Sequence, residues 1–473
     1  MRAGAVLSGT GCGTVPQGKR HSAVMARLSI MWFRRDLRLT DLPALAAAAS
    51  TGKVVPLFVV DPAFANSGAP RRAYMGAALR ALDHALDGAL VYRHGDPAVV
   101  VPALAGEVGA EQVFVSREYG PYGRRRDAAV AAALAGSGRR LIGVGSPYAV
   151  QPGDVRKGDG TPYAVFTPFS RGWRAVGWDH PRPAPQVEWM GAPDVDCDGP
   201  PAPVECPVEI GAVGEEAALA RWDAFLDGSA EHYKERRDRP AVDGTSRLSA
   251  ALRWGTVHPR QLLADLTMQE GHEVFANELA WREFYADVLF HRPDTAWQNL
   301  NPKMAAMPLD TDADARRRFH RWASGQTGFP FVDAGMRQLL ATGWMHNRVR
   351  MVVASFLVKD LHLPWQWGAR HFMAHLVDGD LASNNHGWQW AAGTGTDAAP
   401  YFRVFNPTSQ GERFDPDGEY VRRWVPELAT VGGRAVHAPG LQRPDDYPAP
   451  MVDHAVEREE ALARYRHATS GSR

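Results

Sequence analysis

The stretch from Asp378 to Trp390 holds the densest set of chemically useful side chains in this sequence. It reads Asp-Gly-Asp-Leu-Ala-Ser-Asn-Asn-His-Gly-Trp-Gln-Trp, which combines carboxylates, amides and indoles. If the stretch is helical, Asp380, Asn384 and Trp388 recur at i, i+4 and i+8 and share one face. Such a face can hold a heteroaromatic or polyhydroxylated ligand and pass an electron to it. The alternative is a helix N-terminus with acidic residues at the positive end of its dipole and tryptophans in the core.

A hydroxyl-rich segment upstream is suited to the binding of phosphate. Thr245-Ser-Arg-Leu-Ser249 follows Gly244 and supplies hydroxyl and backbone N–H donors at a predicted loop-to-helix boundary. Tyr233 precedes this segment and could close over the same phosphates. Taken alone, the segment is more typical of an ordinary helix N-cap.

Two predicted helices carry polar and aromatic side chains on one face. The first presents a carboxylate, an indole, a guanidinium and a phenol along one stripe: Glu278, Trp281, Arg282 and Tyr285. In the second, Asn347 and Met351 are i, i+4 neighbours, with Arg348 and Arg350 between them. A purely apolar stripe would indicate core, whereas a mixed stripe borders a cavity or a polar partner. Each helix alone allows a structural explanation, but their joint occurrence favours a ligand site.

The N-terminal part of the chain alternates short apolar runs with Ala/Leu-rich amphipathic segments. The runs predict buried strands at 28–33, 54–60, 90–92, 112–116 and 141–144, and segments 71–86 and 126–134 predict helices. This alternation predicts an α/β domain with a five-stranded parallel, doubly wound sheet. Ligands of such sheets bind beyond the strand C-termini, which here carry Arg34-Arg35-Asp36, Asp61, Gly95-Asp96 and Arg117-Glu118.

The pattern changes twice farther along the chain. Residues 150–213 are rich in Pro, Gly and Asp and predict a surface connector between the α/β domain, at 27–149, and a second domain. From 214 to 473 long helical patterns predominate and strand signals vanish, which predicts an all-α C-terminal domain. Residues 1–26 lack the apolar core of a secretion signal and predict a disordered extension, with Met25 as an alternative start.

Bulk composition narrows the class of protein. The chain has 53 basic and 53 acidic residues, which argues against binding polyanions through net charge and still allows a local basic surface. Cys12, Cys197 and Cys206 show neither disulfide-framework nor metal-site spacing, so we expect a cytoplasmic protein without a metal site. No run of about eighteen apolar residues occurs, so we expect no membrane span.

Several motifs follow one another in a fixed order. They are Trp32-Phe-Arg-Arg-Asp-Leu-Arg-Leu39, the segments 278–285 and 328–347, Asp378–Trp390, and Asp397-Ala-Ala-Pro-Tyr-Phe-Arg-Val-Phe-Asn-Pro407. Together they resemble the DNA photolyase/cryptochrome family, most closely its class I cyclobutane pyrimidine dimer photolyases, from about residue 27 to the end. The resemblance implies an α/β antenna-binding domain and a helical domain that binds FAD in a U-shape. It also implies a photo-lyase in which reduced FAD donates an electron to a flipped-out dimer and splits it.

The resemblance assigns roles to individual residues. FAD-binding positions are Tyr233, Thr245, Ser246, Arg247, Leu248, Ser249, Phe275, Arg282, Asn347, Asp378, Gly379, Asp380 and Asn384. Positions for the dimer and DNA are Glu278, Trp281, Arg282, Tyr285, Asn347, Arg348, Arg350, Met351 and Trp390, and the catalytic ones are Glu278, Asn347 and Asn384. Glu278 would hydrogen-bond the dimer and stabilise its radical anion. Trp281, Trp390 and Met351 would form the apolar walls on which the dimer stacks. Arg348 and Arg350 would contact phosphates. The Asn384 amide would face the flavin without repelling a reduced, anionic ring.

The predicted electron path departs from the family pattern. Trp388 and Trp365 match the proximal and middle members of a tryptophan chain that carries electrons to the flavin. Leu309 stands near the place of the distal tryptophan and has no accessible redox chemistry. We expect that either Trp297 or Trp322 substitutes for it, or that light-driven reduction of the oxidised flavin is impaired.

Two more features depart from the pattern. His386 stands where relatives usually have glycine, and we expect it to face the surface rather than to titrate near the flavin. The candidate antenna contacts are Arg34, Arg35, Asp36 and Glu118. Segment 121–127 resembles the branch that binds a deazaflavin or FMN rather than a folate as second chromophore. Gly120 replaces an acidic residue of that branch, which leaves an altered or unused site as the alternative.

Three other functions compete with dimer repair. A cryptochrome photoreceptor would be expected to carry a C-terminal extension, and no long low-complexity tail is present. A (6-4) photolyase would be expected to show a histidine pair, whereas His346 beside Asn347 is single. A light-independent flavoprotein oxidoreductase is disfavoured because no Gly-x-Gly-x-x-Gly follows the first strand. We expect a monomer that binds double- or single-stranded DNA containing pyrimidine dimers.

Overall fold

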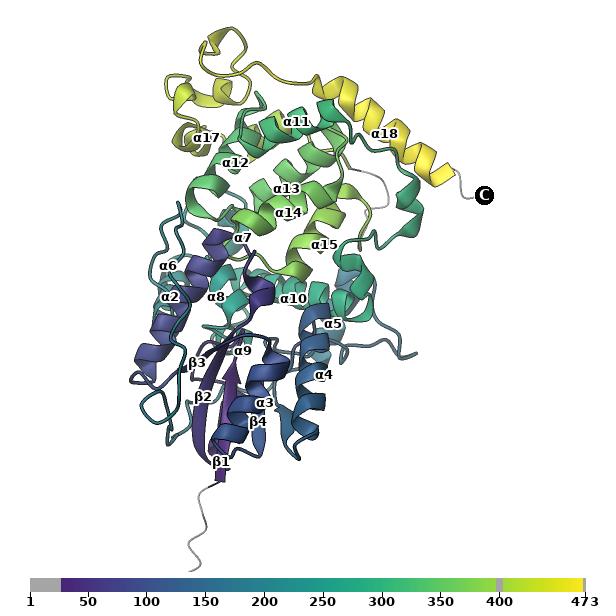
Figure 1. The fold of residues 1–473 in the computed structure, drawn as a ribbon. Coiled ribbons are helices and arrows are strands. Elements are labelled where there is room, and N and C mark those ends of the chain that lie inside the picture. The colour runs from purple at the N-terminus through teal and green to yellow at the C-terminus, as the bar shows by residue number, and fades with distance from the viewer. Residues whose placement is uncertain (1–26, 397–402, 471–473) are drawn as a thin grey trace, which may run out of the picture.

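The first part of the fold is a parallel sheet. A computed structural model describes residues 27–396 and 403–470. The sheet has five strands in the order β3-β2-β1-β4-β5 (Figure 1). They are β1 (Arg27–Phe33), β2 (Gly52–Val60), β3 (Val91–His94), β4 (Gln112–Val115) and β5 (Arg140–Gly143). The predicted strands and the doubly wound sheet are therefore confirmed.

Helices cover both faces of the sheet. They are α1 (Pro43–Ala49), α2 (Ala69–Ala85), α3 (Pro97–Glu107) and α4 (Pro121–Ala135). Met31 and Phe33 of β1 enter one core with α1 and α2, whereas Ile30 and Trp32 enter another with α3 and α4. Successive strand side chains point to opposite faces, so a strand that is covered on both sides reads as a continuous apolar run.

The connector is tied to both parts of the molecule. It contains one helix, α5 (Phe166–Val176). Val54 of β2 donates its N–H to Glu188 O at 2.9 Å and accepts from Met190 N at 3.0 Å. Where the connector begins, Glu283 accepts from the backbone N–H groups of Ala149 and Val150 and, at 2.6 Å, from the indole of Trp173. The connector, which has no regular structure outside α5, is thus held in place by hydrogen bonds to both parts.

The second part is helical. Its helices are α6 (Glu215–Gly228), α7 (Tyr233–Arg236), α8 (Ser249–Trp254), α9 (Pro259–Ala264), α10 (Glu270–His291), α11 (Ala313–Ala323), α12 (Pro330–Thr342), α13 (Asn347–Ser355), α14 (Trp365–His375), α15 (Leu381–Ala392), α16 (Pro407–Phe414), α17 (Glu419–Trp424) and α18 (His454–Ser470). Short 3-10 helices of this part are η2 (Pro293–Ala296), η3 (Pro302–Ala306), η5 (Pro426–Leu428), η6 (Gly433–His437) and η7 (Gly440–Gln442), and η4 (Phe356–Asp360) is a π-helix. One more 3-10 helix, η1 (Pro62–Phe64), follows β2 in the α/β part. Between 214 and 470, outside 397–402, no strand occurs, as predicted.

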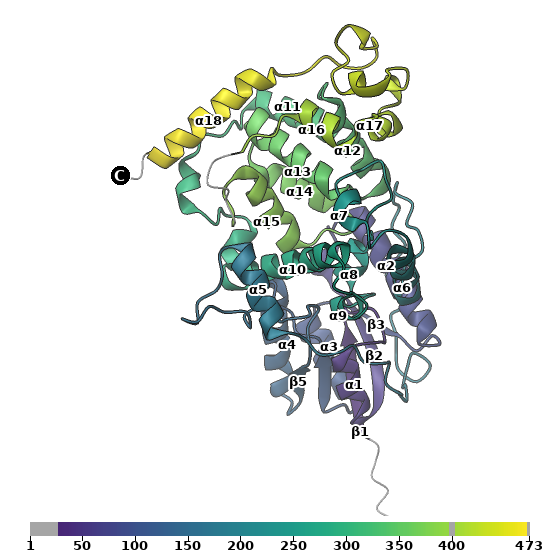
Figure 2. The same cartoon turned by 180° about the vertical axis from the view of Figure 1, so that it is seen from behind.

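Two cores organise the helices. One lies among α11 to α15 and α17, and the other joins α5, α6, α8, α9 and α10. Figure 2 shows α10 running between the upper helices and the α/β part. This long helix therefore carries its side chains to the border of both parts. Within the described ranges, no helix combines the length and the apolarity needed to cross a membrane.

Candidate functional site

A cavity of about 540 Å³, here called the helical cavity, lies among α8, α10, α13 and α15. It brings together predicted residues that are far apart in the sequence. Its walls include Tyr233, Thr245, Ser246, Arg247, Leu248, Ser249, Phe275, Glu278, Trp281, Arg282, Tyr285, Asn347, Arg350, Met351, Asp378, Gly379, Asp380, Asn384, Trp388 and Trp390. Arg348 and Trp365 are predicted site residues that lie outside these walls.

Asp380 explains why α15 begins where it does. Its Oδ1 accepts hydrogen bonds from the N–H groups of Ala382 and Ser383 at 3.1 Å, which is N-cap geometry. Its Oδ2 accepts from Arg35 at 2.8 Å, across the border with the α/β part. Burial would raise the pKa of Asp380, but Arg35 and Arg253 hold that pKa below its usual range. The carboxylate is therefore a charged cap as well as a cavity residue.

Asp378 and Arg350 form an ion pair of 2.8 Å in the cavity wall. The Oδ1 atom of Asp378 is buried and has no hydrogen-bond partner among the described residues, so a ligand O–H or N–H would satisfy it. Outside the wall, Arg348 binds Asp238 through two bonds of 2.8 and 3.1 Å. Facing carboxylates thus hold the guanidinium groups of Arg348 and Arg350, and the contact of these two residues with DNA phosphates stays a prediction.

Two polar groups of the cavity are fixed in place by the backbone and by neighbours. The amide nitrogen of Asn384 donates to Ala369 O at 3.1 Å and to Asn385 Oδ1 at 2.8 Å. The guanidinium of Arg282 donates to two backbone carbonyl oxygens at 3.1 Å each and lies over the ring of Tyr148. Because these bonds already order both side chains, a ligand would meet them without a further entropy cost.

The apolar wall of the cavity is stiffened from outside. Trp281 stacks on Phe166 of α5 with ring centres 3.7 Å apart and an angle of 7°. Trp390 is partly buried against the helical core. Glu278 lies one turn before Trp281 on α10, and Asn347 is exposed at the start of α13. The cavity thus offers indole faces with a carboxylate and an amide beside them, an arrangement suited to stacked, hydrogen-bonding bases.

The donor set of the helical cavity fits FAD. Residues 245–249 supply hydroxyl and backbone N–H groups for a diphosphate, and Asp378 has an unsatisfied acceptor for a hydroxyl or ring N–H. Arg247 has a φ of 53°, in the left-handed region that is rare for a residue with a side chain. Strain of this kind persists where surrounding structure requires it, and it often marks a ligand site.

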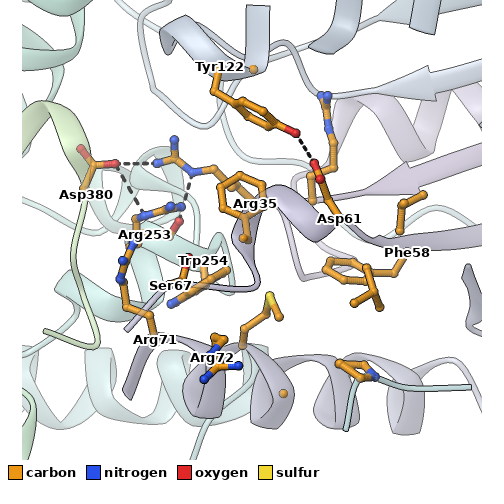
Figure 3. Close-up of a pocket in the computed structure, with 18 of the residues that line it drawn as sticks. Arg35, Phe58, Asp61, Ser67, Arg71, Arg72, Tyr122, Arg253, Trp254 and Asp380 are labelled. Carbon is orange, nitrogen blue, oxygen red and sulfur yellow. Dashed lines mark hydrogen bonds and ion pairs between the residues drawn. The ribbon is translucent and has the colours of Figure 1, made fainter. Parts of the chain in front are cut away.

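A second cavity, of about 700 Å³, lies where the strand ends meet the helical part (Figure 3); we call it the sheet-end cavity. Its walls include Trp32, Arg34, Arg35, Phe58, Asp61, Arg71, Arg72, Glu118, Tyr122, Arg126, Arg253, Trp254 and Asp380, with connector residues between Pro201 and Ile210. Figure 3 shows Arg35, Arg253 and Asp380 directed toward one another on one side and Asp61 bonded to Tyr122 on the other. The two cavities share Arg253 and Asp380 as walls.

Positive charge is crowded at the sheet-end cavity. Burial, aided by the charge of Arg35, lowers the pKa of Arg253 to about 9, and its Nη1 has no hydrogen-bond partner among the described residues. Burial would raise the pKa of Glu118, but Arg126 and Arg34 lower it to about 2. An anionic group would relieve this crowding, so the cavity is suited to a ligand with a negative charge.

Two predicted residues occupy other places than expected. Asp36 is buried outside the sheet-end cavity, because its Oδ1 turns back to accept the Arg34 N–H at 2.7 Å. His386 is fully buried rather than facing the surface: Nε2 lies 2.9 Å from Thr295 Oγ1, and the ring stacks on Tyr285. Burial lowers the pKa of His386 to about 4. The surface expectation was wrong because η2 packs against this face of α15.

Tryptophans lie in the wall of the helical cavity and behind it. Trp388 is buried in its wall, and its ring centre lies 6.0 Å from that of Trp322 on α11. Phe319 lies 5.6 Å from Trp322 and also 5.6 Å from the half-buried Trp367. Trp365 is buried as well, and its indole N–H donates to Asn299 at 2.8 Å. A row of rings therefore leads from the cavity through α11 toward the surface.

Sequence reasoning missed three residues of these sites. Arg237 pairs with Glu278 at 2.6 Å, Arg253 lines both cavities, and Phe166 supports Trp281. The first two stand four residues after Tyr233 and Ser249, a spacing that could have placed them on the same helix faces. Phe166 lies in the connector at the start of α5, and its i, i+3 and i+7 spacing with Phe169 and Trp173 is a signal that could have placed it on the packed face of a helix. Residues 1–26 and the part of the Asp397–Pro407 motif at 397–402 lie outside the described residues.

The arrangement defines a class of protein: an α/β part joined to a helical part whose cavity fits a dinucleotide cofactor. The sequence matches the family model for DNA photolyase over residues 29–187 and that for the FAD binding domain of DNA photolyase over residues 275–467. The chain therefore belongs to the DNA photolyase family.

Known relatives resemble the chain over nearly its whole length. The deoxyribodipyrimidine photo-lyase of Streptomyces griseus is 43% identical over 93% of this chain and 99% of its own length. The solved structure of a class III photolyase from Agrobacterium tumefaciens has a TM-score of 0.84 at 36% identity, covering 96% of this chain and 100% of that chain. An archaeal photolyase from Sulfolobus tokodaii, solved with two FAD molecules, has a TM-score of 0.82 at 29% identity, covering 93% and 99%.

Proposed function

We propose that this chain is a deoxyribodipyrimidine photo-lyase, a carbon–carbon lyase that uses blue light to split cyclobutane pyrimidine dimers in DNA. One observation carries the proposal: the dimer contacts and the FAD donor set converge on one cavity. The dimer contacts are Glu278, Trp281, Asn347, Met351 and Trp390. A relative of that name aligns over 93% of this chain, which supports the same conclusion.

FAD binding uses residues that the fold has already ordered. The hydroxyl and N–H groups of 245–249 would hold the diphosphate, and Asp378 would accept a hydrogen bond from the cofactor through its unsatisfied Oδ1. Asn384 presents an amide rather than a second carboxylate, so it adds no negative charge beside a reduced ring. Reduced FAD, when bound, supplies an electron on absorbing blue light.

The dimer pocket binds, orients and dehydrates the lesion. A dimer that has left the base stack can lie against Trp281, whose ring is kept in one orientation by stacking on Phe166. Glu278 places a polar group beside the bases, where negative charge develops as they accept an electron. Met351 lines the same cavity, and its apolar side chain would keep water away from the reacting bond.

Blue-light reversal of thymine dimers tests the proposal directly. Purified protein, chemically reduced and then illuminated, should restore intact thymines in a dimer-containing oligonucleotide, and a dark control should not. Chromatography of cofactor released by heat should yield FAD. A folded preparation that contains no FAD, or that contains FAD and leaves the dimers intact under light, would overturn the assignment. Repair of (6-4) products instead of dimers would support that competing function, and repair of neither would favour a photoreceptor.

The sheet-end cavity is proposed to hold a second, antenna chromophore. It lies beyond strand C-termini, where α/β sheets bind ligands, and its crowded arginines suit an anionic molecule. A deazaflavin or FMN meets this requirement, and the Sulfolobus relative was solved with two FAD molecules. The contacts proposed are Arg34, Arg35 and Glu118.

We further propose that the enzyme acts as a monomer in the cytoplasm on dimers in double- or single-stranded DNA. Cys197 and Cys206 are free thiols, which suits a reducing compartment. The proposed domains are 27–149 and 214–473, joined by the connector, since β5 ends at Gly143 and α6 begins at Glu215. Gel filtration and light scattering of the purified protein test the monomer.

A further inference from the structure

Three arginines surround one carboxylate where the two cavities meet, a cluster here called the arginine junction. Arg35 Nη2 lies 2.8 Å from Asp380 Oδ2, and Arg253 Nε lies 3.8 Å from the same oxygen. Arg71 of α2 reaches the adjoining backbone, since a Cβ added to Gly379 would lie 3.4 Å from Arg71 Nε. Figure 3 shows the three arginines on the Asp380 side of the sheet-end cavity. One carboxylate therefore serves three cations.

Two of these arginines have N–H groups to spare. The Arg253 Nη1 and Arg71 Nε atoms are buried, and neither has a hydrogen-bond partner in the ranges that the structure describes. Both residues line the sheet-end cavity, so a ligand there can accept hydrogen bonds from them. A buried donor without an acceptor costs free energy, which an incoming oxygen atom recovers.

The other carboxylates of the sheet-end cavity do not balance the junction. Glu118 is engaged by Arg126, whose Nη2 lies 3.4 Å from Glu118 Oε1. Asp61 lies on the opposite side of the cavity, where it bonds to Tyr122 (Figure 3). A phosphate group suits the arginine junction, because it carries up to two negative charges and binds guanidinium groups through several oxygens.

The arginine junction also holds backbone that borders the helical cavity. Arg253 Nε donates to Gly379 O at 3.1 Å, and Asp380 Oδ1 caps α15. Gly379 and Asp380 line the helical cavity. The positive charges of Arg35 and Arg71 repel Arg253 and so oppose its bond to Gly379. An anion beside Arg253 offsets this repulsion and keeps the segment 378–380 in place.

We propose that the arginine junction is a phosphate subsite, and that filling it strengthens the hold of the protein on FAD. The occupant is the phosphate group of a phosphorylated chromophore in the sheet-end cavity, a group that FMN has and a phosphate-free flavin lacks. Because the same residues border both cavities, binding in one favours binding in the other, and the effect is reciprocal. This inference rests on the proposed function and adds a link between its two cofactor sites.

Retention of FAD in the dark measures this link. FAD-loaded protein is filtered repeatedly in phosphate-free buffer that contains FMN, riboflavin or no addition, and chromatography of heat-released cofactor follows the FAD that remains. Riboflavin is the matched control, because it has the ring system of FMN without the phosphate. FMN should slow the loss of FAD about tenfold, within the usual range for coupled sites, and riboflavin should not. An equal effect of inorganic phosphate at the same concentration would support the subsite with free phosphate as its ligand.

Two variants of α2 separate the subsite from general charge effects. Arg71→Gln removes a donor of the arginine junction, so the ratio of FAD loss without FMN to loss with FMN should fall close to one. Arg80→Gln makes the same charge change in the same cavity, about 14 Å farther along the helix, and should keep the wild-type ratio.

The outcomes distinguish this inference from the proposed function. Equal loss of FAD with FMN, with riboflavin and without addition, or faster loss with FMN, would overturn the link while leaving FAD binding and dimer repair intact. An equal fall of the ratio in Arg71→Gln and Arg80→Gln would reduce the subsite to a general charge effect and overturn it. A folded protein that carries no FAD at the start would overturn the proposed function itself.

Discussion

At the scale of single residues, side chains of the helical cavity serve the fold and the site together. Asp380 caps α15, pairs with Arg35 and lines both cavities. Asp378 pairs with Arg350 through one oxygen and offers the other to a ligand. Both readings of the Asp378–Trp390 stretch, helix cap and ligand site, are therefore compatible, since a carboxylate has two oxygens to share.

Glu278→Ala should slow repair while leaving FAD bound. The variant removes one hydrogen bond to a group that gains charge, a loss on the order of 1.5–3 kcal/mol, or roughly ten- to a hundredfold in the affected step. Single-turnover repair under saturating light measures the change, and released FAD shows whether the cofactor stays. Glu278→Gln keeps an N–H donor and should lose less. If the alanine variant repairs dimers at the wild-type rate, Glu278 does not have the proposed role at the dimer site.

His386 should make the protein sensitive to acid. Its pKa is lowered from 6.5 in the unfolded chain to about 4 in the folded one, so the unfolded state binds more protons between these values. The stability that depends on neutral His386 is fully present above pH 6.5 and is lost as the pH falls. The loss in the free energy of unfolding reaches about 2 kcal/mol at pH 5. Urea unfolding measures the free energy of unfolding at pH 7 and at pH 5. Its fall between these pH values should be smaller in His386→Gln than in the wild type by about that amount. Replacing the exposed His180 in the same way should leave the loss unchanged.

At the scale of elements, helix crossings decide which aromatic rings meet. Leu309, which stands near the place where the family resemblance puts a distal tryptophan, is 40% exposed in the segment after η3. The packing of α11 against α14 and α15 instead places Trp322 beside Trp388, with Phe319 and Trp367 beyond it. Of the two substitutes considered, Trp322 is the one whose ring lies next to Trp388.

Trp322→Phe should slow the light-driven reduction of oxidised FAD by an external thiol several-fold, because it removes the redox-active ring next to Trp388. Trp297→Phe should have little effect, since Trp297 is 40% exposed and packs against Arg370. Transient absorption of tryptophan radicals checks both variants. Repair by chemically reduced protein should remain at the wild-type rate in each. If Trp297→Phe alone abolished the radical, the path would run along α14 instead.

At the scale of the whole molecule, two cavities meet at one wall. Arg253 and Asp380 line the helical cavity and the sheet-end cavity alike, and Asp380 joins the parts through Arg35. A chromophore in the second cavity would therefore lie close to the first. Overall charge is balanced at 53 basic and 53 acidic residues, so DNA binding depends on local charge.

DNA binding should weaken with salt, and Arg350→Ala should not change that dependence. A lost phosphate contact lowers the slope of log K against log salt by about one. Arg350 instead holds the buried Asp378, so its removal should leave the slope unchanged and reduce FAD retention. Titrations at several salt concentrations, with Arg350→Lys as the charge-preserving control, decide this. If the slope of log K against log salt falls by one in Arg350→Ala, Arg350 contacts a DNA phosphate.

The residue pattern of the sequence and the tertiary packing determine different features of this protein. The strands, the helical second part and the faces that bear Glu278, Asp380 and Asn384 were predictable, because residue periodicity reports which side of one element is buried. The pairing of Arg350 with Asp378 and the burial of His386 were not, because both depend on which element packs opposite. A charged or polar side chain on a helix face shows that a partner exists. Only the tertiary structure decides whether that partner is a ligand, DNA or another residue of the same chain.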